Sequence, residues 1–481
     1  MKESTNSAQV EHGRIALGYA IVLGLALVAG ALLALGLGMQ PLAGRGGGAS
    51  AEGFRRLYSV HGLLLVFLVV LPAIPAVLGN WMLPRALGRS AMALPRLNLL
   101  AFQIYVVGAL ALLLAVCFAP ADAGWSFELP YALTSSASLG WSLLAMAVLA
   151  TSFVCSSLNL FATVIASRGG GRTWGELSPF SWSIAIASLM QLIAVPLLFV
   201  ALVLLAAQRS GAADVLGTGP AADVRFAQWF WLFGHPALAG ALVAALGIVA
   251  EVISTHTSGP RAATRVEATS MIAIAVLAFA AAGVHVLGRG LSDADAAGTS
   301  ALALATGLPF ALIVLGWVRE LQGPQLRATP ALGFALCFLV LLCVGGMSGA
   351  FLAVLPTASA LRETCFATAQ FHYLVVGGTL SALFAGLYLA WPRWFGVEPR
   401  AGWGFGACAL FFLGINLAFF PLFVLGYLGQ PRRSTEIVAG GEHLGELSAF
   451  GTALVVVALV ITAWNLLSSL LGERKTAEEA A

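Results

Sequence analysis

Four of the seven histidines in this sequence lie inside long apolar segments, where a polar side chain is costly: His61, His235, His285 and His372. Ionisable groups at membrane depth usually mark a functional site, and imidazole is a frequent ligand of haem iron and of copper. A single buried histidine would be explained by a hydrogen bond to a neighbouring helix. Four of them favour a buried metal or haem.

These segments belong to a series of apolar runs that are each long enough to span a bilayer, which takes about 20 residues. Twelve such runs are found, at approximately residues 15–38, 57–84, 97–118, 139–165, 179–206, 227–256, 269–288, 299–318, 331–355, 365–391, 403–428 and 449–471. We therefore predict an all-α polytopic membrane protein. It has one membrane domain at 15–472, an N-terminal segment at 1–14 and a C-terminal tail at 473–481.

The composition excludes other classes of protein. The 481 residues are 60% hydrophobic and 9% charged, which is too apolar for a water-soluble or a disordered chain. The net charge of +3 is small and scattered, so we predict no nucleic-acid partner. The 24 basic residues comprise 22 Arg and 2 Lys, and together with abundant Ala and Gly they suggest a GC-rich bacterial genome.

The basic residues also predict the orientation in the membrane. With a cytoplasmic N-terminus, nine of the 24 Lys and Arg residues fall on the outer side: Arg45, Arg55, Arg56, Arg209, Arg225, Arg289, Arg362, Arg432 and Arg433. The other fifteen fall on the inner side, as the positive-inside rule requires, so both termini are predicted to be cytoplasmic. In this topology the four intramembrane histidines share a layer roughly 5 to 15 Å from the outer surface.

Five segments resemble, in the same order, subunit I of the haem-copper oxidases, the cytochrome c oxidase family. They are VHGLLLVFLVVLPAIPAVLGNWMLPRALGRSAMALPRLN at 60–98, WFWLFGHPALAG at 229–240, CVGGMSGAFLA at 343–353, ATAQFHYLVVGGTLSALFAGLYLAWP at 367–392 and GQPRR at 429–433. The resemblance extends over nearly the whole chain. It implies a twelve-helix bundle of the subunit I type in the bacterial plasma membrane, with both termini on the cytoplasmic side.

The resemblance assigns His61 and His372 as the two axial ligands of a low-spin haem. Two neutral imidazoles from different helices at matched depth can hold one iron between them and leave no coordination position open. The resemblance also assigns Arg432 and Arg433 to the haem propionates. The planar guanidinium group suits carboxylates, which agrees with that role.

The sequence departs from the family pattern at the oxygen-reducing site. Gln370 stands where the family has the histidine ligand of its high-spin haem, and a carboxamide is a poor replacement for imidazole. The copper site retains His235 and His285, but Val284 replaces a further histidine. Ala239 replaces the active-site tyrosine. We therefore expect the high-spin haem and copper to be absent, and interpret the two histidines as relic copper-site positions, because two protein ligands bind a metal weakly.

The residues that deliver protons in the family are replaced as well. Ala237 stands at the position of a glutamate after the His-Pro pair, and Pro309 at the position of a helix lysine. Arg362 and Glu363 replace the His-Asp pair near the outer magnesium site. Oxygen reduction consumes protons, which need titratable groups or ordered water to cross an apolar interior.

Three hypotheses follow. The first is an electron-transfer subunit with one bis-histidine haem in a larger respiratory complex, beside a subunit II-like partner or an intact subunit I. The second is a working terminal oxidase or nitric oxide reductase. The third is a structural pseudo-oxidase subunit whose haem only stabilises the fold. We favour the first. Glu251, about 24 Å along the helix from His235, is expected near the inner interface, close to His256. We interpret it as an interfacial or paired charge, with proton entry as the second choice.

Overall fold

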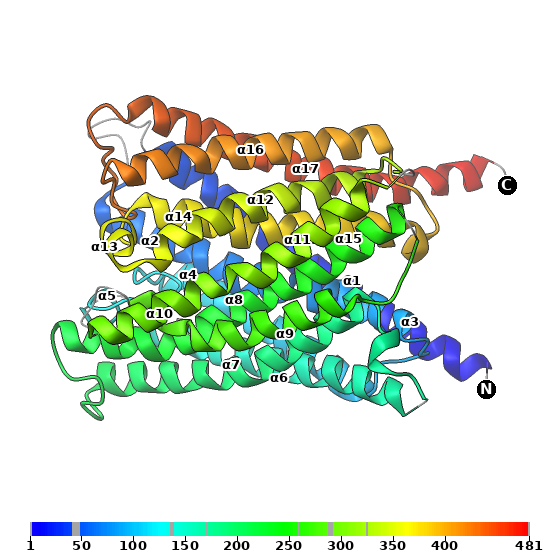
Figure 1. Ribbon diagram of the computed structural model, residues 1–481, viewed down its shortest axis with the longest axis horizontal. Coiled ribbons are helices and arrows are strands. Elements are labelled where there is room, and N and C mark those ends of the chain that lie inside the picture. The colour runs from blue at the N-terminus through cyan, green and yellow to red at the C-terminus, as the bar shows by residue number, and fades with distance from the viewer. Residues whose placement is uncertain are drawn as a thin grey trace.

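The computed structural model describes residues 2–40, 49–134, 139–169, 171–257, 259–286, 292–323 and 326–479. Over these residues it contains helices and no β-strand, and eleven helices are long and apolar enough to cross a membrane. They lie side by side along the long axis of the molecule (Figure 1). Arg45 and Arg289, which we assigned to outer loops, lie outside the described residues.

Eight of the eleven spans are single helices. They are α1 (Lys2–Met39), α4 (Pro95–Phe118), α6 (Leu139–Arg168), α7 (Pro179–Ser210), α8 (Pro220–His256), α12 (Pro330–Ala353), α16 (Ala401–Tyr427) and α17 (Glu442–Glu479). Since α1 starts at Lys2 and α17 extends to Glu479, the predicted terminal segments continue the first and last helices.

The other three spans are composite. The second span joins α2 (Ala51–Leu65), the π-helical turns η2 (Val66–Val70) and η3 (Ala73–Gly79), and α3 (Asn80–Ala86). Another joins α10 (Asp293–Ala305) to α11 (Gly307–Leu321). The last joins α14 (Cys365–Phe371), the π-helical turn η6 (His372–Gly377) and α15 (Gly378–Phe395). Short helices α5 (Tyr131–Thr134), η4 (Trp174–Glu176) and α13 (Leu355–Leu361) lie in the connections.

The prediction of twelve spans is not confirmed at the apolar run 269–288, among the residues that the structure describes. This run forms α9 (Arg265–Ala280), which has 16 residues, followed by the 3-10 turn η5 (Ala282–Val286). A straight span needs about 20 residues, so α9 is too short to be one by itself. The sequence does not reveal this break, because the residues on both sides of it are apolar. Only the backbone conformation changes, to a 3-10 turn around Gly283.

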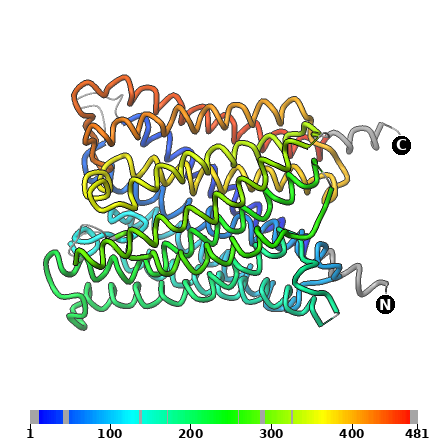
Figure 2. Tube along the Cα trace, viewed as in Figure 1, coloured from blue at the N-terminus to red at the C-terminus, as the bar shows by residue number. Residues whose placement is uncertain are grey.

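The two ends of the bundle are named here by the short helices that they carry. The α13 end also carries α5, and the opposite end carries α3 (Figure 1). Helix α1 begins and α17 ends at the α3 end. The trace in Figure 2 shows α16 and α17 side by side along one flank, where they pack against each other.

Side-chain caps and prolines define several helix starts. The hydroxyls of Ser50, Ser178 and Thr329 each accept a hydrogen bond from the backbone N–H three residues later. The last two precede Pro179 and Pro330, at the first helical position, where no N–H is needed. These polar starts lie at the ends of the apolar runs, so they fix where each span begins.

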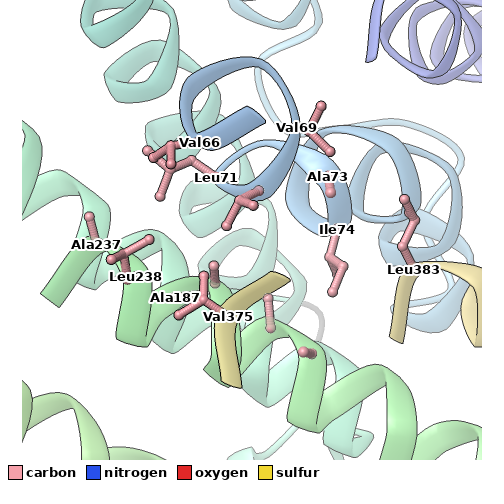
Figure 3. Packing of buried hydrophobic residues seen from close by; sticks show 14 of the residues in the cluster. Val66, Val69, Leu71, Ala73, Ile74, Ala187, Ala237, Leu238, Val375 and Leu383 are labelled. Carbon is pink, nitrogen blue, oxygen red and sulfur yellow. The ribbon is translucent and has the colours of Figure 1, made fainter. Parts of the chain in front are cut away.

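The π-helical turns interrupt the second span around two prolines. Leu71 donates its N–H to the carbonyl of Val66, five residues back, over 3.1 Å. The next residue is Pro72, which has no N–H to continue an α-helix. The span is nevertheless deeply buried, and it packs in the apolar cluster of Figure 3 with α8 and η6: Val66, Val69, Leu71, Ala73, Ile74, Ala237, Leu238 and Val375.

Candidate functional site

The imidazole rings of His61 and His372 face each other near the α13 end. Their centroids are 6.4 Å apart and their planes are inclined by 18°. His61 lies on α2, and His372 is the first residue of the π-helical turn η6. The structure thus brings together two histidines that are 311 positions apart in the sequence (372 − 61).

Each ring is oriented by a backbone carbonyl. The Nδ1 atom of His61 lies 3.0 Å from the carbonyl oxygen of Gly30 on α1, and that of His372 lies 2.8 Å from the carbonyl oxygen of Thr368. A carbonyl oxygen only accepts, so Nδ1 carries the proton in both rings and donates it. The Nε2 atom of each neutral imidazole is therefore free of a proton and can act as a ligand.

Gly30 allows the close approach of α1 and α2 that this contact requires. A Cβ atom at position 30 would lie only 2.4 Å from Cδ2 of Leu65 on α2. The other ring is held by packing, because Phe419 of α16 stacks on His372 with centroids 4.2 Å apart and planes 15° apart. Both imidazoles are consequently fixed in position by neighbouring helices.

Two cavities meet at the histidine pair. The first, which we call the slot, has a volume of about 970 Å³ including its mouth and lies among α1, α2, α14, α16 and α17. The second, the chamber, has a volume of about 1230 Å³ including its mouth and reaches α8, η5 and α12. Both are lined by Tyr58, His61, Thr368, His372 and Arg432, so the gap between the imidazoles joins them.

The spacing of the pair fits a single metal centre between the rings. Two metal–imidazole bonds of about 2.0–2.1 Å, plus roughly 1 Å from each nitrogen to its ring centre, give about 6 Å between the ring centres. The observed 6.4 Å agrees with this value. Because the gap opens into a cavity on either side, His61 and His372 could hold an iron at the centre of a flat macrocycle.

Arg432 and Arg433 lie at the α13 end beside the same cavities. Arg432 forms ion pairs with Glu363 over 2.7 Å and with Glu128 over 3.1 Å, and Arg433 pairs with Glu128 over 2.6 Å. Burial lowers the pKa of Arg432, but the carboxylates of Glu128 and Glu363 outweigh this effect and raise that pKa above its ordinary value. The guanidinium of Arg433 also lies over the ring of Tyr58, 5.3 Å from its centroid.

Backbone contacts hold this arginine segment against the start of α14. The N–H of Cys365 donates to the carbonyl of Gln430 over 2.9 Å, and the N–H of Arg432 donates to that of Glu363 over 3.2 Å. Gln430 is itself fixed, since its amide oxygen accepts from the N–H of Val438. The position of Arg432 relative to His372 is thereby set by the backbone.

Gln370 faces the chamber and not the slot. It contributes to the chamber lining, and its Nε2 atom lies 3.4 Å from the position that a Cβ atom on Gly349 of α12 would take. Phe371 lies between it and His372 in sequence, and the ring of Phe371 is 5.9 Å from that of Trp125. The side chains of Gln370 and His372 therefore leave their helix in different directions, as we expected from their spacing.

His235 and His285 contact each other on the far side of the chamber. The Nδ1 atom of His235 lies 2.9 Å from Nε2 of His285, and the ring of Trp231 stacks on His285 with centroids 3.6 Å apart. In the part of the chain that the structure describes, no group of three or more His, Cys, Asp or Glu side chains could hold a metal ion. The pair is thus a hydrogen-bonded unit supported by an aromatic ring.

The remaining positions that depart from the family pattern lie in apolar surroundings. Ala237 is fully buried in the cluster of Figure 3. Pro309 is buried on α11, and Ala239 is partly buried on α8. Val284 packs in a small apolar cluster with Ala296 of α10 and Ala358 of α13.

Glu251 and His256 lie close together near the C-terminal end of α8. One carboxylate oxygen of Glu251 is buried without a hydrogen-bond partner among the described residues. Five residues further along α8, Nε2 of His256 lies 2.8 Å from the hydroxyl of Thr329. This contact joins α8 to the start of α12.

Residues 14–472 match the family model described as "Cytochrome C and Quinol oxidase polypeptide I". The chain belongs to this family. Among similar subunits, "Cytochrome c oxidase subunit 1" of Bacillus subtilis (strain 168) is 27% identical over 460 residues, covering 94% of this chain and 74% of that protein. The corresponding subunit of Cereibacter sphaeroides is 29% identical over 410 residues, covering 81% of this chain and 71% of that protein.

A solved haem-copper oxidase has a fold similar to that of this chain. A chain of the heme-copper terminal oxidase dimer solved by cryo-EM superposes with a TM-score of 0.78, covering 94% of this chain and 84% of that one, at 15% identity. The predicted family and the all-helical membrane fold are therefore confirmed, and the count of twelve spans is not. The chain is a multi-pass membrane protein of the cytochrome c oxidase subunit I type.

Sequence analysis did not find three residues that complete this site. Gly30 and Glu128 act through contacts with residues distant in sequence. Trp125, by contrast, carried a signal, because it is the one tryptophan in the connection 119–138 between two apolar runs. Its ring lies between those of Phe371 and Trp231, at 5.9 and 5.7 Å.

Proposed function

We propose that this chain is a subunit I-like protein of a respiratory complex that holds one low-spin haem between His61 and His372 and serves electron transfer. The observation that carries the proposal is the pair of imidazoles, 6.4 Å apart and inclined by 18°, with each Nδ1 engaged by a backbone carbonyl. A haem ligated on both faces supplies a one-electron couple and no open position for oxygen.

Different residues of the chain would bind the iron of this haem, orient its ligands and contact its carboxylates. His61 and His372 would hold the haem iron through their Nε2 atoms, and the carbonyls of Gly30 and Thr368 keep both rings in the required tautomer and orientation. Arg432 and Arg433 present cationic groups to carboxylates at the α13 end. Phe419 and Leu422 of α16 give the slot an apolar wall.

The oxygen-reducing site of the family is proposed to be lost in this chain. Gln370 takes the place of a haem ligand, and Val284 takes the place of a copper ligand. The two remaining histidines, His235 and His285, are hydrogen-bonded to each other. No titratable side chain stands at Ala237 or Pro309. These features together favour a chamber without a second haem or copper.

Absorption spectra of the purified protein test the proposal. The oxidised and reduced forms are expected to show the bands of one six-coordinate low-spin haem, with one haem per chain. Carbon monoxide is expected to leave the reduced spectrum unchanged, because both axial positions are occupied. A spectral shift with carbon monoxide, or a second haem, would favour a working oxidase and refute the proposed loss.

Three alanine variants assign the ligands. His61→Ala and His372→Ala are expected to abolish the low-spin bands, whereas His235→Ala retains them at wild-type haem content. His235 is a suitable control because it is also a histidine within a membrane span, and its ring contacts His285 and not the proposed ligands. Equal haem content in all three variants would contradict the assignment of the ligands.

Rapid kinetics separates electron transfer from a structural role. In native membranes, the haem of an electron-transfer subunit is reduced by the respiratory donor as fast as the complex turns over. A haem that never changes oxidation state during turnover would identify a structural pseudo-oxidase subunit instead. We propose that the partners are other respiratory subunits in the bacterial plasma membrane, with both termini of this chain in the cytoplasm.

A further inference from the structure

The two arginines at the α13 end are not free to serve a haem alone, because carboxylates of the chain already contact them. Glu128 contacts both guanidinium groups, 2.6 Å from Arg433 and 3.1 Å from Arg432, and Glu363 contacts Arg432 at 2.7 Å. The cluster thus contains two positive and two negative groups. It is neutral before any haem propionate is added.

Glu128 is the better buried of the two carboxylates. Its side chain is 23% exposed, whereas that of Glu363 is 58% exposed. Its second oxygen accepts a hydrogen bond from the hydroxyl of Ser126 over 3.0 Å, so both oxygens are engaged. Burial and three partners hold this negative charge in one place, where water screens it less than it screens Glu363.

Glu128 also lies next to the proposed haem position. It lines the chamber together with Tyr58, His61, His372 and Arg432. A fixed negative charge near a haem stabilises the ferric over the ferrous state, because the ferric state carries one more positive charge. The arginines have the opposite effect, so the balance between these groups sets the potential.

We propose that Glu128 is a positioning residue of the haem site, which holds Arg432 and Arg433 side by side and offsets their positive charge, thereby lowering the reduction potential of the haem. The inference rests on the proposed function, since it requires a haem between His61 and His372. Glu128 acts through the two arginines that its carboxylate contacts.

A spectroelectrochemical titration of the purified protein tests this role, with Glu128→Gln as the main variant. The glutamine keeps the shape of the side chain and removes its charge. We expect an unchanged haem content and an upward shift of the midpoint potential. Glu128→Asp keeps the charge and should lie closer to the wild-type potential than Glu128→Gln does.

Two single variants and one double variant serve as controls. Glu363→Gln should give a smaller upward shift, because this carboxylate is more exposed and contacts one of the two arginines. Glu446→Gln should give a much smaller shift than Glu128→Gln, because Glu446 is 59% exposed and pairs with His443 and not with the arginines. The double variant Glu128→Gln/Arg433→Gln removes one charge of each sign and should return the potential toward the wild-type value.

The outcomes separate this inference from the proposed function. A wild-type protein without a bis-imidazole haem spectrum overturns both. Normal haem content with an unshifted potential in Glu128→Gln overturns the role of Glu128 alone. If Glu128→Gln loses its haem, the double variant decides: retained haem near the wild-type potential supports charge compensation, and loss of haem there refutes it.

Discussion

The contact between His61 and Gly30 makes a specific prediction for the variant Gly30→Ala. The new Cβ atom would lie 2.4 Å from Cδ2 and 2.5 Å from Cγ of Leu65. Carbon atoms pack at about 3.5–4.0 Å, and the overlap includes Cγ and not only the end of the Leu65 side chain, so we expect α1 and α2 to separate by roughly 1 Å. This lengthens the His61 Nδ1 to Gly30 oxygen distance from 3.0 Å to roughly 4 Å, beyond the range of a hydrogen bond.

The expected cost combines two terms. Overpacking at such a contact costs about 1–3 kcal/mol, and the lost hydrogen bond costs about 0.5–1.5 kcal/mol. Removing the partner of a ligating histidine lowers metal affinity by about 10–100-fold. We therefore expect Gly30→Ala to release haem about 10–100-fold faster than the wild type.

The assay is the rate of haem transfer from detergent-purified protein to an excess of a haem-scavenging globin. Gly24→Ala is the matched control, because Gly24 lies on the same helix and a Cβ atom there meets nothing within 4 Å. Leu65→Ala combined with Gly30→Ala removes the overlap and should restore slow transfer. Wild-type transfer in Gly30→Ala alone would refute the role of this close approach.

Three further predictions concern packing and charge. Arg261 pairs with Glu267 and Glu320, each over 2.8 Å, so Arg261→Gln should destabilise the protein by about 1–3 kcal/mol in a denaturant titration; the exposed Arg265→Gln should change stability by less than about 0.5 kcal/mol. Phe419→Ala removes the ring stacked on His372 and should broaden the low-spin resonance spectrum; an unchanged spectrum would contradict this role. Asn465 bonds to Tyr388 and to both backbone groups of Arg400, so Asn465→Leu should lower thermal stability, and equal stability would show that these bonds add nothing.

Much of the fold was predictable because a membrane span is encoded by a continuous stretch of about 20 apolar residues. A run of apolar residues bounded by charge or by a capping hydroxyl, such as Thr329 before Pro330, marks its own ends in the sequence. The break after Ala280 was not predictable in this way. It is a change of backbone conformation within residues that remain apolar.

The candidate site was predictable only where chemistry and spacing coincide. His61 and His372 stood out because imidazole is rare at membrane depth and both lie in recognisable motifs. Glu128 did not stand out, because its proposed role depends on its ion pair with Arg432, which is 304 positions away in the sequence. Gly30 could not be identified from the sequence either, because its role depends on the close approach of Leu65 from the neighbouring helix.

The three π-helical turns have a consequence for how this protein tolerates changes of length. A π-helical turn contains one residue more than the α-helical turn that it replaces. Deleting one residue within 372–377 would therefore convert η6 to an α-helical turn, and the residues of α15 beyond it would keep nearly the same orientation. Such a shortened chain would still cross the bilayer with the same face of α15 toward its neighbours, whereas a deletion within a regular α-helix would rotate everything beyond it by about 100°.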